Sequence, residues 1–248
     1  MVNKLNPRLQ ESLEEQPLDT QGFERPRELI DVIDEDLAPL LDLTQRPVVS
    51  ASQFTREQLL QLARLAARYE TQPQMIARPL TGKILVSAFY EPSTRTRLSF
   101  ESAWHRLGGD IMSITDPAST GIAKGESLYD VGEMLNHYSD LVVLRDSDKN
   151  AVYEMLESLR IPIINGGNGT DEHPTQAMAD IYALLKWRPS LFIQGNADAA
   201  PVRIGIVGVP SRMRTVHSLL VFLALFADAI AEVVIVSDDD QPFADGQQ

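Results

Sequence analysis

Short apolar runs alternate with stretches of helical periodicity along most of the chain. Between residues 48 and 237 we predict strands at 83–90, 110–114, 141–144, 161–164, 202–207 and 232–236. The stretches between them repeat apolar residues every three or four positions and predict helices at 55–66, 98–107, 128–138, 152–159, 174–187 and 215–226. This alternation indicates an α/β fold with a doubly wound parallel sheet covered by helices on both faces.

The spacing of these elements predicts two domains. Four strand–helix units fall between residues 83 and 187, which is enough for one doubly wound domain. The polar stretch 187–201 resembles a linker, and only one strand–helix–strand unit follows it. So few parallel strands cannot cover both faces of a sheet. We predict an acidic N-terminal extension at 1–47, a complete domain at 48–189 and an incomplete second domain at 190–248, which ends in loop composition.

The composition excludes several classes of protein. Of the 248 residues, 44% are hydrophobic and none is cysteine, so disulfides, thiolate metal sites and a cysteine nucleophile are ruled out. The net charge of −13 argues against nucleic acid and anionic membranes as partners. The longest apolar run, at 219–227, is too short to span a bilayer, and residues 1–10 do not resemble a secretory signal. We expect a soluble, cytoplasmic protein.

The negative charge is concentrated at the two ends of the chain. Residues 1–50 hold 11 acids and 5 bases, and residues 238–248 hold 4 acids and no base, which together account for −10 of the −13. The first segment therefore has the composition of a solvated or loosely attached extension, with a partner-binding arm as the alternative. Its apolar residues at 29–33 and 37–41 predict short helices that dock on another surface.

The loop after the first predicted strand has the composition of an anion site. Residues 91–97 contain Ser93, Thr94, Arg95 and Thr96, and a helix follows them. Hydroxyl and guanidinium donors beside the free N–H groups of a helix start suit a phosphate group. The alternative is ordinary helix capping with surface arginines. Neither a Walker loop nor a GxGxxG fingerprint occurs in the chain.

The loops after the third and fourth predicted strands add further donors. Arg145 follows the third strand, and the glycine-rich loop 165–176 brings His173 and Gln176 to the start of a helix. Because the carboxyl ends of parallel strands share one edge of the sheet, these groups are expected to meet there and to polarise a carbonyl oxygen. A capping or packing histidine is the alternative for His173. The other histidines, His105, His137 and His217, lie within predicted helices and are assigned as packing or surface residues.

Together these segments resemble the aspartate and ornithine carbamoyltransferase family. The resemblance covers roughly residues 48–237 and rests on the segments FYEPSTRTRLSFESAWHRLGGD, STGIAKGESLYD, YSDLVVLR, GNGTDEHPTQAMADIYAL and VGVPSRMRTVHSL, which occur in the family's order. It implies a carbamoyl-phosphate-binding domain at 48–189 and the start of an amino-acid-binding domain at 190–248. It implies no cofactor and no metal.

The resemblance also assigns roles to the polar residues. It implies a carbamoyl phosphate site made of Ser93, Thr94, Arg95, Thr96, Arg145, His173 and Gln176. In this assignment the first four hold the phosphate group and Gln176 holds the carbamoyl amino group. Thr96, Arg145 and His173 contact the carbonyl oxygen, with His173 as a neutral or cationic donor. These three and Arg95 are the expected catalytic residues.

A second loop implies an oligomer. Residues 119–127 are small and polar, with a single lysine, and alone predict only a mobile loop. By resemblance, Ser119, Thr120 and Lys124 enter the active site of a neighbouring subunit, which implies a homotrimer with shared sites.

The resemblance also indicates a second substrate. The segment 213–218 is similar to the aspartate branch of the family, in which Arg214 and Thr215 bind aspartate. The implied reaction is carbamoyl transfer to L-aspartate in pyrimidine synthesis. Asp146 and Val131 depart from the family's usual residues, and its later substrate motifs do not occur in this chain. A carbamoyltransferase for another amino acid and a non-catalytic relative therefore remain as alternatives.

Overall fold

A computed structural model describes residues 25–75, 77–189, 201–238 and 243 of the chain. It contains two parallel sheets: four strands in the order β2-β1-β3-β4, and two strands, β5 and β6. The strands are β1 (Ile84–Phe89), β2 (Asp110–Ile114), β3 (Leu141–Asp146), β4 (Ile163–Asn168), β5 (Val202–Val207) and β6 (Ile230–Val236). The α-helices are α3 (Pro26–Val32), α4 (Ala38–Leu41), α5 (Arg56–Thr71), α6 (Thr94–Arg106), α7 (Leu128–Leu135), α8 (Ala151–Leu156), α9 (Pro174–Trp187) and α10 (Arg214–Ala224).

The predicted α/β fold with a parallel sheet is confirmed, and each predicted strand and helix has its counterpart. Several boundaries differ from the prediction, two of them in the predicted polar loops. Helix α6 begins at Thr94, four residues before the apolar periodicity starts. Its first turn carries polar residues that are not buried in the core, so the apolar pattern does not report it. Strand β4 continues to Asn168 through two glycines, so the first third of the predicted glycine-rich loop is strand.

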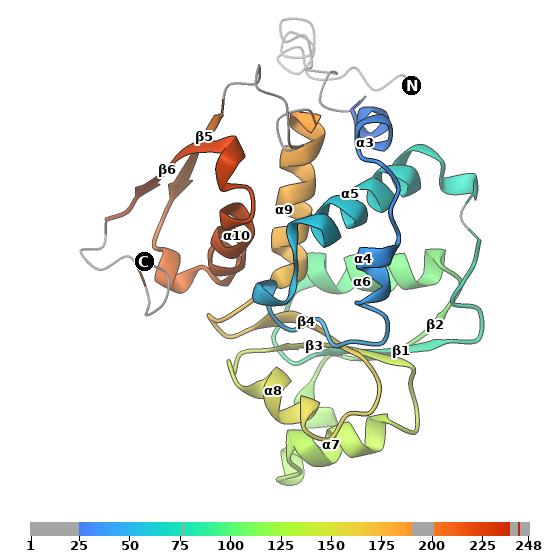
Figure 1. Cartoon of the computed structure of the whole chain (residues 1–248). Coiled ribbons are helices and arrows are strands. Elements are labelled where there is room, and N and C mark those ends of the chain that lie inside the picture. Colours follow the sequence, from blue (N-terminus) through green and yellow to red (C-terminus); the bar gives the residue numbers. More distant parts are fainter. Residues whose placement is uncertain (1–24, 76, 190–200, 239–242, 244–248) are drawn as a thin grey trace, which may run out of the picture.

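The central strand β1 shows how the four-stranded sheet is covered on both faces. Val86 and Ala88 belong to the cluster that includes α7 and α8, whereas Leu85 and Phe89 pack with α6. This alternation follows from the two-residue period of a strand. The helices consequently lie in two layers, with α7 and α8 on one side and α6 and α9 on the other (Figure 1).

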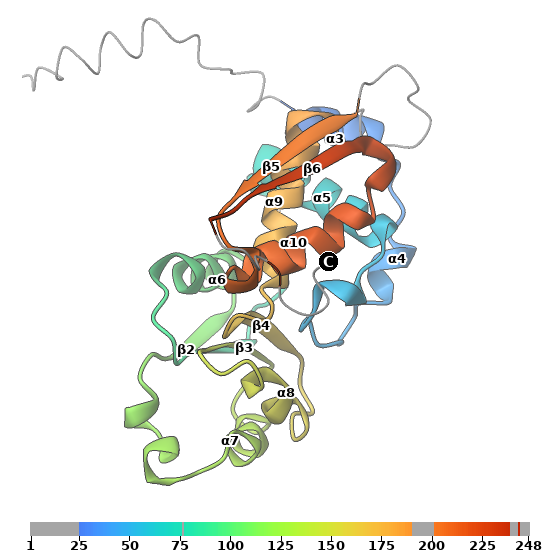
Figure 2. The ribbon, with the colours of Figure 1, turned by 90° about the vertical axis from the view of Figure 1, so that its left-hand side faces the viewer.

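A second core forms around α9. Helix α10 packs along α9, and this cluster also takes in α3, α5 and β5. Helices α9 and α10 therefore connect the two-stranded sheet to the first sheet (Figures 1 and 2). Its other face is open, with Val207 and Val236 exposed. Residues 190–200 of the predicted linker lie outside the described residues, as do residues 1–24 of the predicted extension.

The prediction of a loosely attached N-terminal segment is wrong for residues 26–33. The short helices predicted at 29–33 and 37–41 are present as α3 and α4, and they dock on this chain itself. Leu29 is completely buried among α5 and α9. On α5, Gln61 Nε2 donates to the carbonyl of Asp34 at 2.8 Å and Arg64 Nε to that of Ile33 at 2.8 Å. The acidic charge of the segment did not reveal this attachment, because buried apolar residues, Leu29 and Ile33 among them, and hydrogen bonds to backbone carbonyls produce it.

No helix in the described ranges is both long and apolar enough to cross a membrane.

We expect Leu29→Ala to destabilise the protein by about 2–5 kcal/mol, since it removes a fully buried side chain and leaves a cavity between α3, α5 and α9. Urea unfolding followed by circular dichroism measures the change. Leu41→Ala, at a side chain 69% exposed, is the matched control and should change stability by less than about 0.5 kcal/mol. Equal effects of the two substitutions would mean that α3 is not part of the core.

Candidate active site

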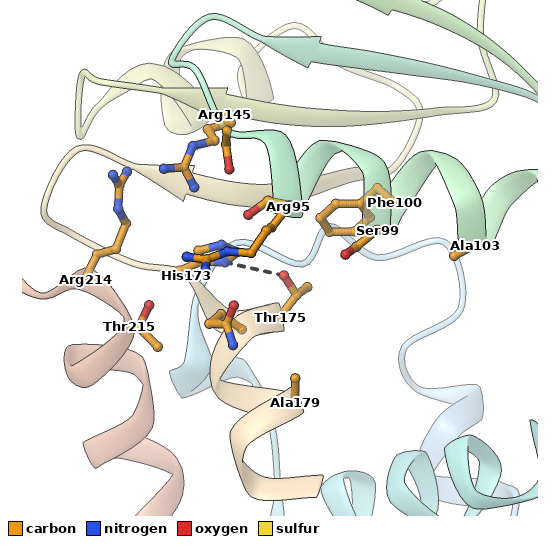
Figure 3. Close-up of a pocket in the computed structure, with 13 residues that line it drawn as sticks. Arg95, Ser99, Phe100, Ala103, Arg145, His173, Thr175, Ala179, Arg214 and Thr215 are labelled. Atoms are coloured by element: carbon orange, nitrogen blue, oxygen red, sulfur yellow. Dashed lines mark hydrogen bonds between the residues drawn. The ribbon is translucent and has the colours of Figure 1, made fainter. Parts of the chain in front are cut away.

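A cavity of about 670 Å³ opens at the carboxyl edge of the four-stranded sheet, between α6, α9 and α10 (Figure 3). Its lining comprises Ser93, Arg95, Thr96, Ser99, Phe100, Ala103, Arg145, His173, Thr175, Gln176, Ala179, Arg214 and Thr215. Phe89 of β1 pairs with Arg145 of β3, so the loops after these two strands begin side by side. The parallel register thus brings together residues that lie far apart in the sequence.

The start of α6 contributes the first group of donors. Ser93, Arg95 and Thr96 line the cavity, whereas Thr94 is exposed and does not. Ser93 occupies the N-cap position, but its side chain makes no capping hydrogen bond. The capping alternative therefore does not hold for this hydroxyl. The first-turn N–H groups of α6, which have no intrahelical acceptor, lie beside it.

Two guanidinium groups share one carboxylate at the edge of the cavity. Arg214 donates to both oxygens of Glu91, at 2.8 and 2.7 Å, and Arg145 donates to Glu91 Oε1 at 3.1 Å. Arg145 Nη1 also donates to the carbonyl of Gly166 at 3.1 Å. Burial acts to raise the pKa of Glu91, but the hydrogen bonds and charges of the two arginines outweigh it and hold that pKa below its ordinary value. Glu91 is therefore ionised.

His173 is held rigidly at the start of α9. It is the N-cap residue, its side chain is only 5% exposed, and its backbone N–H donates to Ser218 Oγ of α10 at 2.9 Å. Ser218 in turn donates to the buried carboxylate of Glu172, which also accepts a hydrogen bond from Ser50 at 2.8 Å. The backbone at His173 is therefore held by α10, and the side chain of the preceding Glu172 is held by both α10 and Ser50.

The imidazole of His173 is neutral. Burial lowers its pKa to about 4, and the positive charges of Arg145 and Arg214 act in the same direction, with Glu91 opposing them. Of the neutral and cationic forms that the sequence left open, the surroundings select the neutral one near pH 7. A neutral imidazole can donate a hydrogen bond from one nitrogen only.

Gly167 makes the close approach of these groups possible. Its φ of +112° lies in the region that L side chains avoid. A Cβ at this position would lie 2.9 Å from Arg145 Nη1, 3.3 Å from His173 Cδ2 and 3.4 Å from Arg214 Cδ. Any larger residue would separate the cationic groups from the histidine.

The structure brings most, but not all, of the expected site residues together. Ser93, Arg95, Thr96, Arg145, His173, Gln176, Arg214 and Thr215 line one cavity. Ser119, Thr120 and Lys124 do not: they lie in or between the turns η3 (Pro117–Ser119) and η4 (Gly121–Lys124), which project between β2 and α7 (Figure 2). The Ser119 and Thr120 hydroxyls bond to carbonyls within this loop, and Lys124 is exposed.

Sequence reasoning missed Glu91 and Thr175. Glu91 lies in the predicted anion-binding loop, where a carboxylate would repel an anionic ligand unless cationic side chains neutralise it. Arg145 and Arg214 become those partners only in the folded chain. Thr175 lies between His173 and Gln176 in the sequence, so its place beside the histidine was the one available signal.

Within residues 25–75, 77–189 and 201–238, no group of three or more His, Asp or Glu side chains is arranged to hold a metal ion.

The chain matches a known protein family. A family model described as "Aspartate/ornithine carbamoyltransferase, carbamoyl-P binding domain" matches residues 46–186. The chain therefore belongs to the aspartate/ornithine carbamoyltransferase family, and the resemblance seen in the sequence is confirmed.

Individual relatives point to the aspartate branch. The aspartate carbamoyltransferase catalytic subunit of Saccharophagus degradans is 40% identical over 195 residues, which are 78% of this chain and 56% of that protein. The corresponding subunit of Methanopyrus kandleri is 39% identical over 79% of this chain and 60% of its own length. The chain thus spans somewhat more than half the length of these curated relatives.

Solved structures share the fold. Aspartate transcarbamoylase from Trypanosoma cruzi in complex with carbamoyl phosphate and aspartate has a TM-score of 0.68 and 33% identity, covering 80% of this chain and 59% of that one. The same enzyme in complex with N-(phosphonacetyl)-L-aspartic acid also has a TM-score of 0.68, with 29% identity over 81% of this chain and 68% of that one.

We expect nuclear magnetic resonance to show His173 neutral from pH 8 down to about pH 5, with a midpoint near 4. Glu91→Gln should lower the midpoint further, since it removes the negative charge that opposes Arg145 and Arg214. Glu133→Gln, which alters the distant surface ion pair with Arg160, is the control and should leave it unchanged. An ordinary midpoint of about 6.5 would show that the imidazole is not shielded as described.

Proposed function

We propose that the chain transfers the carbamoyl group of carbamoyl phosphate to the amine of L-aspartate, forming N-carbamoyl-L-aspartate and phosphate in pyrimidine synthesis. The observation that carries the proposal is the convergence of Arg95, Thr96, Arg145 and His173 on one cavity at the start of α6. Such a set of donors fits a substrate that joins a phosphate group to a carbonyl group. The names and bound ligands of the relatives support the same chemistry.

In the proposed complex, the phosphate group lies at the N-terminus of α6. The side chains of Ser93, Arg95 and Thr96 bind its oxygens, and Thr94 contributes its backbone N–H, because its side chain is turned outward. Gln176, in the first turn of α9, receives the carbamoyl amino group through its side-chain oxygen. The carbonyl group then lies between the starts of α6 and α9.

The reaction places negative charge on the carbonyl oxygen. The amine of aspartate attacks the carbon, a C–N bond forms, and the C–O bond to phosphate breaks. Thr96, Arg145 and His173 stabilise the oxygen in the transition state as preorganised donors. The departing phosphate accepts the proton that the amine loses. A neutral His173 suits this role, because it donates a hydrogen bond without becoming a proton source.

Arg214 and Thr215 are proposed to hold the aspartate. Both line the cavity from α10, on the side opposite α6 (Figure 3). A guanidinium group binds a carboxylate through two parallel hydrogen bonds, as Arg214 already does with Glu91. Binding of an aspartate carboxylate by Arg214 would therefore either displace Glu91 or leave Glu91 bonded to part of the guanidinium group.

We also propose two domains and a homotrimer with shared active sites. Residues 48–189 would form the carbamoyl-phosphate-binding domain and residues 190–248 part of the amino-acid-binding domain, in keeping with the two separate sheets. Lys124, Ser119 and Thr120 would complete the cavity of a neighbouring subunit. Their loop projects from this chain and does not reach its own cavity, which supports that arrangement.

The direct test is to mix the protein with carbamoyl phosphate and a panel of amines and to measure phosphate release. Release with aspartate and not with ornithine supports the proposal. Release with another amine would reassign the second substrate. Binding of a phosphonate analogue without turnover would identify a non-catalytic relative.

His173→Ala should lower kcat by about 10²–10³, because one donor to the carbonyl oxygen is lost. Phosphate binding, followed by calorimetry, should weaken only modestly. The control is His137→Ala, at an exposed residue of the same type. Full turnover in His173→Ala would remove His173 from this role.

Mixing two inactive variants tests the shared site. His173→Ala and Lys124→Ala, each inactive alone, should regain about a quarter of the wild-type activity after dissociation and random reassembly, since half the cavities and half the loops are then intact. Two variants of the same cavity, His173→Ala and Arg145→Ala, should regain none. Absence of recovery in the first mixture contradicts sharing between subunits.

A further inference from the structure

The position of the proton on His173 determines what the neutral imidazole can do. If Nε2 carries the proton, the ring donates from that nitrogen and Nδ1 accepts; in the other tautomer the roles are exchanged. In this structure Nδ1 lies 3.5 Å from Thr175 Oγ1, at the long end of hydrogen-bond reach (Figure 3). Nε2 has no partner among the described residues. Because Nδ1 faces Thr175, donation to a ligand oxygen from Nε2 requires the tautomer with the proton on Nε2.

Thr175 is placed to make that selection. It is the second residue of α9, and its side chain lines the cavity next to the imidazole. Within the described chain, Nδ1 is the single partner of its hydroxyl group. The backbone N–H of His173 is already bonded to Ser218 Oγ and so does not compete for that hydroxyl.

Counting donors and acceptors favours donation from the threonine. If Nδ1 donated to Thr175 Oγ1, the hydroxyl proton would have no acceptor in the described chain and Nε2 would present a lone pair toward the cavity. If the hydroxyl donates to Nδ1, its proton is satisfied and the N–H of Nε2 remains for a ligand. A hydroxyl group rotates freely enough to adopt either role, so the better-satisfied arrangement is preferred.

We propose that Thr175 is a positioning residue whose hydroxyl donates to Nδ1 of His173 and holds the imidazole in the tautomer with the proton on Nε2. The tautomer itself is independent of the reaction. Its consequence for catalysis rests on the proposed function, in which Nε2 donates to the carbonyl oxygen.

Nitrogen-15 spectroscopy of the full chain tests the tautomer directly, without substrate. His173→Gln identifies the His173 signals among those of the four histidines. At pH 7 the wild type should show an unprotonated Nδ1 and a protonated Nε2. Thr175→Val, which keeps the shape and removes the hydroxyl, should shift the population toward the other tautomer, and Thr175→Ser should restore it.

Two results would overturn the proposal: a wild type with the proton on Nδ1, or a Thr175→Val variant with the wild-type population. Thr175→Ala replaces the valine variant if that protein does not fold.

Kinetics test the catalytic consequence separately. Loss of one net hydrogen bond should lower kcat in Thr175→Val by about two- to tenfold. The KM for carbamoyl phosphate should stay unchanged, and Thr175→Ser should recover the rate. A wild type without turnover refutes the proposed function and leaves the spectroscopic result to decide the tautomer. An unchanged kcat with a shifted tautomer would separate Thr175 from catalysis.

Discussion

The Glu91 carboxylate, shared by Arg145 and Arg214, is the interaction on which the site depends. Two guanidinium groups at the edge of one half-buried cavity repel each other. Each positive charge therefore disfavours the charged form of the other group. The carboxylate offsets one of these charges and fixes the direction of both side chains. With Arg95 added, the cavity keeps an excess of positive charge in a protein whose net charge is −13. An acidic protein can therefore bind an anion through local arrangement rather than through its overall charge.

The same carboxylate connects parts of the chain that belong to different sheets. Glu91 follows β1, Arg145 lies in the last two residues of β3, and Arg214 begins α10 beside the two-stranded sheet. Ser218 of α10 makes a second connection, since its hydroxyl oxygen accepts a hydrogen bond from the backbone N–H of His173. The environment of the imidazole is thus set jointly by the first sheet and by α10. A displacement of α10 would alter both the charge beside His173 and the support of its backbone.

Much of the fold follows from the sequence because the relevant signals are local. The period of apolar residues located the strands and helices, and the parallel topology then put the loops after β1, β3 and β4 at one edge. Ser93, Arg95, Thr96, Arg145, His173 and Gln176 could therefore be predicted as one group.

The remaining features depend on contacts between distant residues. A carboxylate such as Glu91 has no evident role in an anion site until its two arginines are placed around it. The protonation state of His173 likewise depends on its burial and on Arg145 and Arg214, which no local pattern reports. The attachment of residues 26–33 depends on side chains of α5 that bond to backbone carbonyls, and such contacts leave little mark on composition.

The core around α9 also has a consequence for how the protein is made. It joins Leu29, near the start of the described chain, to Phe222 and Ala229, near its end. During synthesis this core cannot close until α10 has left the ribosome, although β1 to β4 are complete much earlier. Contacts between such distant residues form slowly, because the loop-closure entropy is lost before the contacts compensate for it. The first sheet is therefore expected to assemble early, with α9 covered on one side only, and the histidine at the start of α9 is among the last groups to reach its final place.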